Sequence, residues 1–362
     1  MSLDSYTTLG NSGLRVSPFS LGTMTFGEDW GWGTSVADAE AILARYIEEG
    51  GNFVDTANVY TYGHSEKIIG DYVAGRSGLR DRLVLATKFF CNLYRNDPNG
   101  GGASRKAIIA QAEQSLRRMN TDYIDLYWLH NFDAFTPVEE TMRALDDLVT
   151  SGKVRYIGFS DTPAWATAQA HTIAQFRGWA PLVALQLNYS LLERTVEGEL
   201  MPMAQQLGMG VTPWSPLAGG ALSGKYTRQD VGRTDADRGW MVSGYLADKT
   251  FDIVDELRKI AAELNTTPAA VALAWVQGRP GVTSTIIGAR RLSQLEDNLK
   301  ALDLQLAPEH IAALDGLSTP TLNFPAHING QSAANLAHAG ATVNGRATEP
   351  IYFAPETDAQ RY

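Results

Sequence analysis

The sequence predicts a (β/α)8 barrel, because of the rhythm of its apolar segments and because of their number. Short apolar runs alternate with longer stretches of helical periodicity, which is typical of βα units. Eight such runs occur, and eight parallel strands that are each followed by a helix most simply close into a barrel. The expected strands are residues 18–22, 52–56, 83–88, 123–130, 154–160, 183–188, 210–215 and 284–288.

A doubly wound open sheet is the competing fold, and it fits less well. Such a sheet usually has fewer strands, and when it binds a dinucleotide it carries a G-x-G-x-x-G turn after the first strand. Here the first expected strand is followed by GTMTFGEDWGWG, which does not match. A small hairpin that turns at residues 11–13 precedes that strand and is in a position to plug one end of a barrel.

Three of the expected helices share a start signal. A threonine in the N-cap position is followed by proline at the first helical position, at Thr136, Thr162 and Thr267. Glu139 would complete a capping box with Thr136. These signals fix where the helices after three of the strands should begin.

The chain is expected to divide at residue 319. Residues 1–319 form the barrel, and residues 320–362 form a loop-rich C-terminal extension that is small, polar and aperiodic. Two readings of this extension remain open. It is either a mobile extension or a loop that lies over a site or a neighbouring subunit.

Composition excludes several classes of function. The net charge is -10 and the basic residues are scattered, which argues against nucleic acid as a partner. Cys91 is the one cysteine, so we expect neither a disulfide framework nor a cysteine-based metal cluster. No secretory signal and no apolar run long enough to cross a membrane is seen, so we expect a cytoplasmic protein without a membrane partner.

Four polar residues fall at the ends of consecutive expected strands, where barrel enzymes carry their chemistry. They are Asp55, Tyr60, Lys88 and His130. Taken singly, each has an ordinary structural reading: a helix cap, a surface aromatic, a solvated charge and a satisfied histidine. Four groups of complementary type at three neighbouring strand ends instead indicate a catalytic site.

The chemistry that these residues suggest is proton transfer to a carbonyl oxygen. Tyr60 would be the acid, and a neighbouring Lys88 ammonium would lower its pKa. Asp55 would hold Lys88, because a buried lysine needs a carboxylate partner. His130 would hydrogen-bond the carbonyl oxygen. None of these side chains supplies hydride, so a cofactor must.

Seven motifs together resemble the aldo-keto reductase superfamily, in its bacterial and potassium-channel-β-subunit-like branch. They are FVDTANVYTYGHSE, ATK, YWLH, IGFS, LQLNYS, WSPLAGGALSGKY and IIGARRLSQLEDN, and the resemblance covers residues 6–317. It implies a catalytic tetrad of Asp55, Tyr60, Lys88 and His130, with Tyr60 as general acid. It also implies NADPH, bound in extended form across the barrel mouth, with NADH less expected.

The stretch GGALSGKY, residues 219–226, matches a phosphate-binding P-loop until its last position, where Tyr226 replaces the magnesium-binding hydroxyl. We therefore reject a nucleotide-triphosphate site. The resemblance instead implies contact with the cofactor pyrophosphate through Ser215, Leu217, Gly219 and backbone N–H groups. It also implies that Trp214 stacks on the nicotinamide.

The resemblance assigns the ends of the cofactor to two further segments. Gln186 and Asp161 would contact the carboxamide, although the family more often has asparagine where this chain has Asp161. Arg290 would meet a 2′-phosphate, because a guanidinium offers a planar fork of donors. The complete expected cofactor set is Thr23, Met24, Asp55, Ser160, Asp161, Gln186, Trp214, Ser215, Leu217, Gly219, Lys225, Gly288, Arg290, Gln294 and Asn298.

The predicted function is the reduction of aldehydes or ketones to alcohols. The expected substrate contacts are Met24, Trp30, Tyr60, Phe90 and His130, which make an apolar and aromatic pocket. Residues 227–249 are expected to close over the cofactor.

Two other functions and one question of assembly stay open. The chain could hold cofactor and act as a regulatory or partner subunit with slow chemistry. A metal-dependent sugar isomerase would need several carboxylate or histidine ligands at the rim, and only Asp55 and His130 are found, so we expect no metal. A homo-oligomer is possible.

Overall fold

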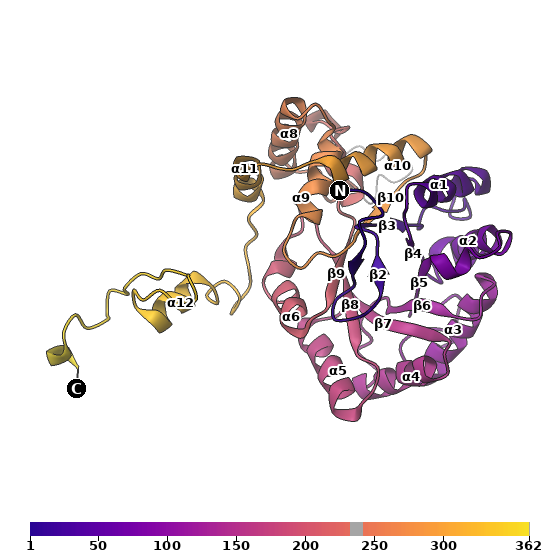
Figure 1. Cartoon of the computed structure of the whole chain (residues 1–362), viewed down its shortest axis with the longest axis horizontal. Helices are drawn as coiled ribbons and strands as arrows, with labels where there is room; N and C mark the ends of the chain where they lie inside the picture. The colour runs from indigo at the N-terminus through magenta and orange to yellow at the C-terminus, as the bar shows by residue number, and fades with distance from the viewer. Residues whose placement is uncertain (232–241, 362) are drawn as a thin grey trace.

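The computed structural model describes residues 1–231 and 242–361, and it confirms the (β/α)8 barrel (Figure 1). Eight strands form one parallel sheet in the order β10-β3-β4-β5-β6-β7-β8-β9. Val211 of β9 bridges to Val282, just before β10, which closes the barrel. The strands are β3 (Phe19–Gly22), β4 (Phe53–Asp55), β5 (Val84–Phe89), β6 (Ile124–Leu129), β7 (Val154–Ser160), β8 (Leu182–Asn188), β9 (Gly210–Trp214) and β10 (Thr285–Gly288).

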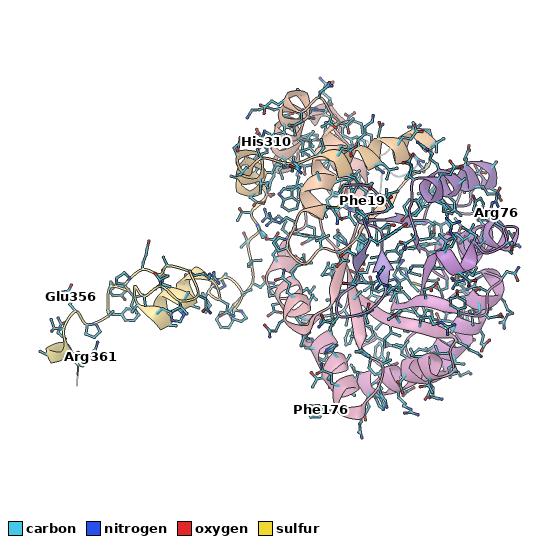
Figure 2. All side chains as sticks on the ribbon, in the orientation of Figure 1. Phe19, Arg76, Phe176, His310, Glu356 and Arg361 are labelled. Atoms are coloured by element: carbon cyan, nitrogen blue, oxygen red, sulfur yellow. The ribbon has the colours of Figure 1, made fainter. Side chains whose placement is uncertain are left out.

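Helices surround the sheet, and their side chains fill the space between the two layers (Figure 2). On α4, for example, Met142, Leu145 and Leu148 recur at helical spacing and are buried against the strands. The helices are α1 (Val36–Glu48), α2 (His64–Ala74), α3 (Arg105–Arg118), α4 (Val138–Thr150), α5 (Ala164–Arg177), α6 (Leu200–Leu207), α8 (Asp248–Glu263), α9 (Pro268–Gln277), α10 (Leu292–Leu299), α11 (Pro308–Ser318) and α12 (Gln331–His338). Within the described ranges, no helix is long and apolar enough to cross a bilayer.

An N-terminal hairpin lies across one end of the barrel (Figure 1). Its strands β1 (Thr7–Thr8) and β2 (Arg15–Val16) pair antiparallel, as predicted. Leu9 and Val16 pack with Trp128 and other inward-facing strand residues in one buried cluster. Trp128 needs the space above Gly158, where an added Cβ would lie 2.4 Å from the indole ring. The hairpin therefore covers the end of the barrel opposite the strand C-termini.

The helix starts only partly follow the prediction. Thr267 is the N-cap of α9, and its hydroxyl accepts from the Ala270 N–H at 3.1 Å, as expected. At α4 and α5 the expected threonine caps are wrong, because Pro137 and Pro163 occupy the N-cap position.

At α4 and α5 the threonine hydroxyls are oriented toward acceptors outside the helices. Thr136 donates to the Asp133 carboxylate at 2.8 Å, and Thr162 donates to the Ser160 carbonyl at 3.0 Å. The expected capping box fails as well, since the Glu139 side chain accepts from Arg177.

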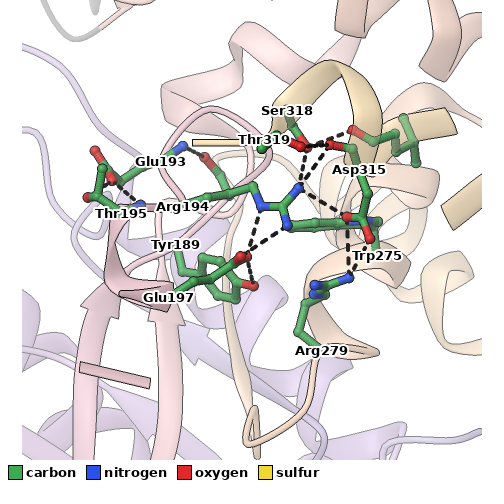
Figure 3. Close-up of polar contacts among 12 residues, drawn as sticks. Tyr189, Glu193, Arg194, Thr195, Glu197, Trp275, Arg279, Asp315, Ser318 and Thr319 are labelled. Carbon is green, nitrogen blue, oxygen red and sulfur yellow. Dashed lines mark hydrogen bonds and ion pairs between the residues drawn. The ribbon is translucent and has the colours of Figure 1, made fainter. Parts of the chain in front are cut away.

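A buried polar network joins the segment after β8 to α9 and α11 (Figure 3). Arg194 is only 6% exposed, and it donates to the two carboxylate oxygens of Glu197 at 2.8 and 3.0 Å. It also donates to Asp315 at 3.0 Å, and the Trp275 indole N–H donates to the same Asp315 oxygen at 3.1 Å. The network fixes α11, the last helix of the barrel, against the rest of the molecule.

The described part of the C-terminal extension runs away from the barrel (Figure 1). Near its root, Leu322 and Ala326 lie beside Gly198, and beyond them α12 stands apart from the barrel. The extension therefore does not cover its own barrel mouth in this structure. The division of the chain at residue 319 stays a prediction.

Candidate active site

The four residues predicted from the strand ends meet at one mouth of the barrel. Asp55 is the last residue of β4, Tyr60 begins the 3₁₀ turn η1 (Tyr60–Gly63), Lys88 lies in β5, and His130 directly follows β6. Parallel strands that are neighbours in the sheet end at the same rim, so sequence order alone brings these side chains together.

Lys88 is the centre of this cluster and is fully buried. Its ammonium group forms an ion pair with Asp55. It also donates to the Thr56 carbonyl at 2.8 Å and to the Tyr60 hydroxyl at 3.3 Å. All three donor positions of the ammonium group thus have partners, which offsets the cost of burying its charge.

Asp55 connects the cluster to the opposite side of the barrel. Its second carboxylate oxygen accepts from the Gln186 side-chain amide of β8 at 3.0 Å. Its backbone carbonyl accepts from the Thr23 N–H at 3.0 Å. Both carboxylate oxygens therefore have a partner, and the fixed carboxylate in turn fixes the position of the Lys88 ammonium group.

His130 stands edge-on to Tyr60, with the two ring centroids 5.9 Å apart and the planes at 80°. Burial, with a smaller contribution from Lys88, lowers the pKa of His130 to about 3. Its imidazole is consequently neutral at physiological pH and has one N–H to donate.

Lys88 lowers the pKa of Tyr60, as expected, but the net shift is upward. Burial of the phenol is the largest influence and raises the pKa of Tyr60, and Lys88 opposes it without overcoming it. Burial also lowers the pKa of Lys88, but Asp55 and Tyr60 outweigh that, so the pKa of Lys88 is raised. At neutral pH the cluster therefore holds a protonated phenol beside an ammonium group.

The residues expected to bind cofactor follow the ends of other strands around the same mouth. Thr23 and Met24 follow β3, Ser160 ends β7, Trp214 ends β9, and Gly288 ends β10. The Trp214 indole N–H donates to the Asp161 carboxylate at 3.0 Å. The sequence did not predict this contact between two cofactor candidates.

The glycine-rich segment after β9 forms the 3₁₀ turn η4 (Ala218–Ser223), with no α-helix opening directly after the strand. Gly219 has φ +66°, a left-handed conformation that suits glycine, and its N–H donates to the Ser215 hydroxyl at 3.1 Å. Leu217 packs against the core, and the Lys225 ammonium lies 4.7 Å from the Tyr226 ring centroid. The P-loop reading stays rejected on this geometry.

The segment around α10 is braced by its own side chains. The Gln294 amide oxygen accepts from the Arg290 N–H at 2.8 Å, and the Asn298 amide donates to the Gly288 carbonyl at 3.2 Å. Gln294 and Asn298 thus hold the loop that carries Arg290, in addition to any ligand they would touch.

The sequence model of the aldo/keto reductase family matches residues 18–319, which is most of the chain and nearly all of the barrel. The chain belongs to the aldo/keto reductase family. It is therefore an oxidoreductase with a barrel fold, and the family acts on carbonyl compounds.

Individual relatives of this aldo-keto reductase agree with that assignment. The chain is 40% identical over 321 residues to the uncharacterized oxidoreductase YrpG of Bacillus subtilis, covering 86% of this chain and 95% of the relative. It is 36% identical over 323 residues to a probable voltage-gated potassium channel subunit beta of Oryza sativa, covering 86% and 96%. It is 33% identical over 349 residues to an NADP(+) aryl-alcohol dehydrogenase of Phanerodontia chrysosporium, covering 91% and 90%.

Aromatic rings gather beside the tetrad of this aldo-keto reductase. The Trp30 ring centroid lies 6.4 Å from that of Tyr60 and 5.5 Å from that of Trp32. Tyr62 adds a further edge contact to Trp30, at 6.3 Å. Of the other substrate candidates, His130 also flanks Tyr60, and Phe90 packs against a buried core cluster.

Sequence reasoning missed one side chain at the centre of the site. The Cys91 sulfur lies 3.8 Å from Nδ1 of His130. Burial raises the pKa of the Cys91 thiol, so it stays protonated. Its place three residues after Lys88 was the available signal, but only the fold shows that it reaches the imidazole.

Two further expectations concern a metal ion and the segment predicted to close over the cofactor. In the part of the chain that the structure describes, no cluster of three or more His, Cys, Asp or Glu residues is placed to hold a metal ion. The segment predicted to close over the cofactor, residues 227–249, lies partly outside the described residues, because 232–241 are not among them.

Proposed function

We propose that this aldo-keto reductase reduces aldehydes or ketones to alcohols with NADPH, and that Tyr60 is the general acid. The observation that carries the proposal is the buried Lys88, which binds Asp55 and the Tyr60 hydroxyl at the same time, beside a neutral His130. A structural ion pair would not require a phenol and an imidazole at the same point.

Each residue then has a distinct task. Tyr60 gives its proton to the carbonyl oxygen, and its raised pKa keeps that proton available at neutral pH. Lys88 stabilises the phenolate that remains, and Asp55 keeps Lys88 in place. His130 donates an N–H to the same oxygen and thereby orients the substrate.

The residues at the mouth fit a nicotinamide cofactor, which supplies hydride when it is bound. A carboxamide needs both donors and acceptors. The buried oxygen Asn188 Oδ1, at the end of β8, has no hydrogen-bond partner among the described residues. Together with Ser160, Asp161 and Gln186 it would hold the carboxamide, and Arg290 would meet the 2′-phosphate. The NADP(+) of the Phanerodontia chrysosporium relative supports this choice.

The substrate class that this site favours is aromatic aldehydes. Trp30 and its aromatic neighbours offer ring faces and edges directly beside Tyr60, and such contacts stabilise a planar ring beyond simple burial. The name of the aryl-alcohol dehydrogenase relative points the same way.

The test is the loss of nicotinamide absorbance with a panel of aromatic and aliphatic aldehydes and ketones, supplying NADPH and NADH in parallel. We expect oxidation of NADPH, fastest with aromatic aldehydes. We also expect Tyr60→Phe to lower kcat by about 10²–10⁴-fold, with the Kd for NADPH nearly unchanged. Strong loss of NADPH binding in this variant would contradict the assigned role.

One result would favour the partner-subunit reading instead. If the wild-type protein binds NADPH tightly but oxidises it with no member of the panel, cofactor holding rather than turnover becomes the better description. The rice relative, a probable potassium channel subunit, makes this arm of the test worth running.

A further inference from the structure

Asp161 stands where the family resemblance leads one to expect asparagine, and the structure shows how it is held. It directly follows β7, and its N–H donates to the Gln186 carbonyl at 3.2 Å. Its φ is +43°, in the left-handed region that aspartate and asparagine tolerate better than most residues. One carboxylate oxygen accepts from the Trp214 indole N–H at 3.0 Å.

These contacts do not explain the choice of aspartate over asparagine. An asparagine oxygen would accept the same hydrogen bond from Trp214, and the left-handed backbone suits both residues. What aspartate adds is a negative charge. The residue is exposed at the mouth, yet the protein around the carboxylate removes enough water to raise its pKa, against the opposite effects of Trp214 and Lys88.

The charge is placed where it would distinguish the two redox forms of a nicotinamide. Asp161 touches Trp214, the residue proposed to stack on the ring, and lies beside Gln186, which binds Asp55 of the tetrad. The oxidised ring carries a formal positive charge, and the reduced ring is neutral. The phosphates and the adenosine are the same in both forms.

We propose that Asp161 is a specificity-determining residue that favours the oxidised cofactor over the reduced one. This inference rests on the proposed function. Opposite charges a few ångströms apart at a partly exposed site change an equilibrium constant by roughly tenfold. Because the charge would stabilise the bound oxidised form, it would favour hydride transfer from bound NADPH to the carbonyl. The same charge would slow the release of NADP⁺ after the reduction.

The test compares the wild-type protein with Asp161→Asn, which keeps the shape and the acceptor for Trp214 and removes the charge. The Kd values for NADP⁺, NADPH, NAD⁺ and NADH are measured by calorimetry near pH 8, well above the ordinary pKa of aspartate. We expect the ratio of the oxidised to the reduced Kd to rise about tenfold in the variant, equal to about 1.4 kcal/mol. The NAD and NADP pairs should show the same rise, because the 2′-phosphate is constant within each pair.

A matched control is Asp122→Asn, which makes the same change of charge at an exposed residue before β6, at the end of the barrel opposite the mouth. Its ratio should equal that of the wild type. If Asp161→Asn leaves the ratio within about twofold of wild type, or weakens the binding of the oxidised and reduced cofactors equally, the inference is wrong. Asp161 would then only help to position neighbouring side chains. If the wild-type protein binds none of the four nucleotides, the proposed function fails, and this inference fails with it.

Discussion

Burial keeps Tyr60 and His130 neutral, and neighbouring groups keep Lys88 charged. Burial is the largest influence on the pKa of Tyr60, Lys88 and His130, and only at Lys88 do the partners overcome it. The outcome is a neutral phenol, a charged ammonium group and a neutral imidazole. This is the protonation pattern that an acid-catalysed carbonyl reduction requires before the reaction starts.

The pKa of His130 makes a prediction for stability against pH. Its folded pKa of about 3 lies below the ordinary 6.5, so its contribution to the free energy of unfolding is present above pH 6.5 and is lost as the pH falls toward 3. We expect the wild-type protein to lose about 2 kcal/mol more than His130→Asn between about pH 7 and pH 5. Urea unfolding of both proteins at each pH measures this difference.

The control for that experiment is His327→Asn, in the C-terminal extension, where the histidine is exposed. It should follow the wild-type curve. Equal losses in the wild type and in His130→Asn would show that the imidazole is not held neutral by burial.

For single residues, the sequence predicts which side chains form the site better than it predicts their protonation states. Asp55, Lys88 and His130 could be predicted because neighbouring parallel strands end at one rim. The direction of the Tyr60 shift could not, because it depends on how completely several loops exclude water from the phenol. The approach of Cys91 to His130 joins two loops whose relative position only the fold determines.

At the scale of elements, strands were easier to predict than helix starts. The apolar runs gave every barrel strand to within one or two residues, because a strand buried on both faces is almost continuously apolar. A threonine followed by proline was ambiguous, because the same pair adopts different roles at α4 and α9. At α4 the Thr136 hydroxyl points to the Asp133 carboxylate, a neighbour that only the fold reveals.

This difference predicts two unequal effects of the same substitution. Thr267→Ala removes a true N-cap hydrogen bond and should lower the free energy of unfolding by about 1 kcal/mol. Thr136→Ala removes only a side-chain contact with Asp133 next to its helix and should cost less. Denaturant unfolding of the two variants checks the order, and a larger loss for Thr136→Ala would contradict the assigned caps.

The network around Arg194 predicts a larger effect. Arg194→Met would leave Glu197 and Asp315 without their central partner, in a region where Arg194 itself is almost fully buried. We expect a loss of about 3–5 kcal/mol in unfolding free energy.

Arg177→Met is the matched control for Arg194→Met. Arg177 pairs with Glu139 at the surface, so its removal should cost at most about 1 kcal/mol. Similar losses in the two variants would show that α11 is not held by the network. Thermal or urea unfolding measures both.

For the whole molecule, the family match and the barrel occupy the same part of the chain. The family match ends at residue 319, and the extension beyond it runs away from the barrel (Figure 1). The sequence predicted the change in character at this point from composition alone. It could not choose between a mobile extension and a covering loop, because small polar residues suit both.

The extension therefore gives a prediction for truncation. A chain that stops after residue 329 keeps the contacts of Leu322 and Ala326 beside Gly198 and loses α12 and the residues beyond it. We expect its Tm to be within about 2 °C of the full chain, because few contacts of the barrel are removed. The rate of NADPH oxidation should also be unchanged.

A marked fall in the Tm or in the rate would contradict this prediction and show that the barrel depends on the extension. Sedimentation of both chains would then show whether the assembly has changed.

The contact between Cys91 and His130 has a practical consequence for measuring the site. Cys91 is the chain's one cysteine, so any thiol-directed label attaches at the barrel mouth beside His130. Because its thiol stays protonated at neutral pH, labelling will be slow there and faster in mildly alkaline solution. A ligand that fills the mouth should protect the thiol. The mass of the intact chain after timed alkylation would therefore report, without any chromogenic substrate, what fraction of the molecules is occupied.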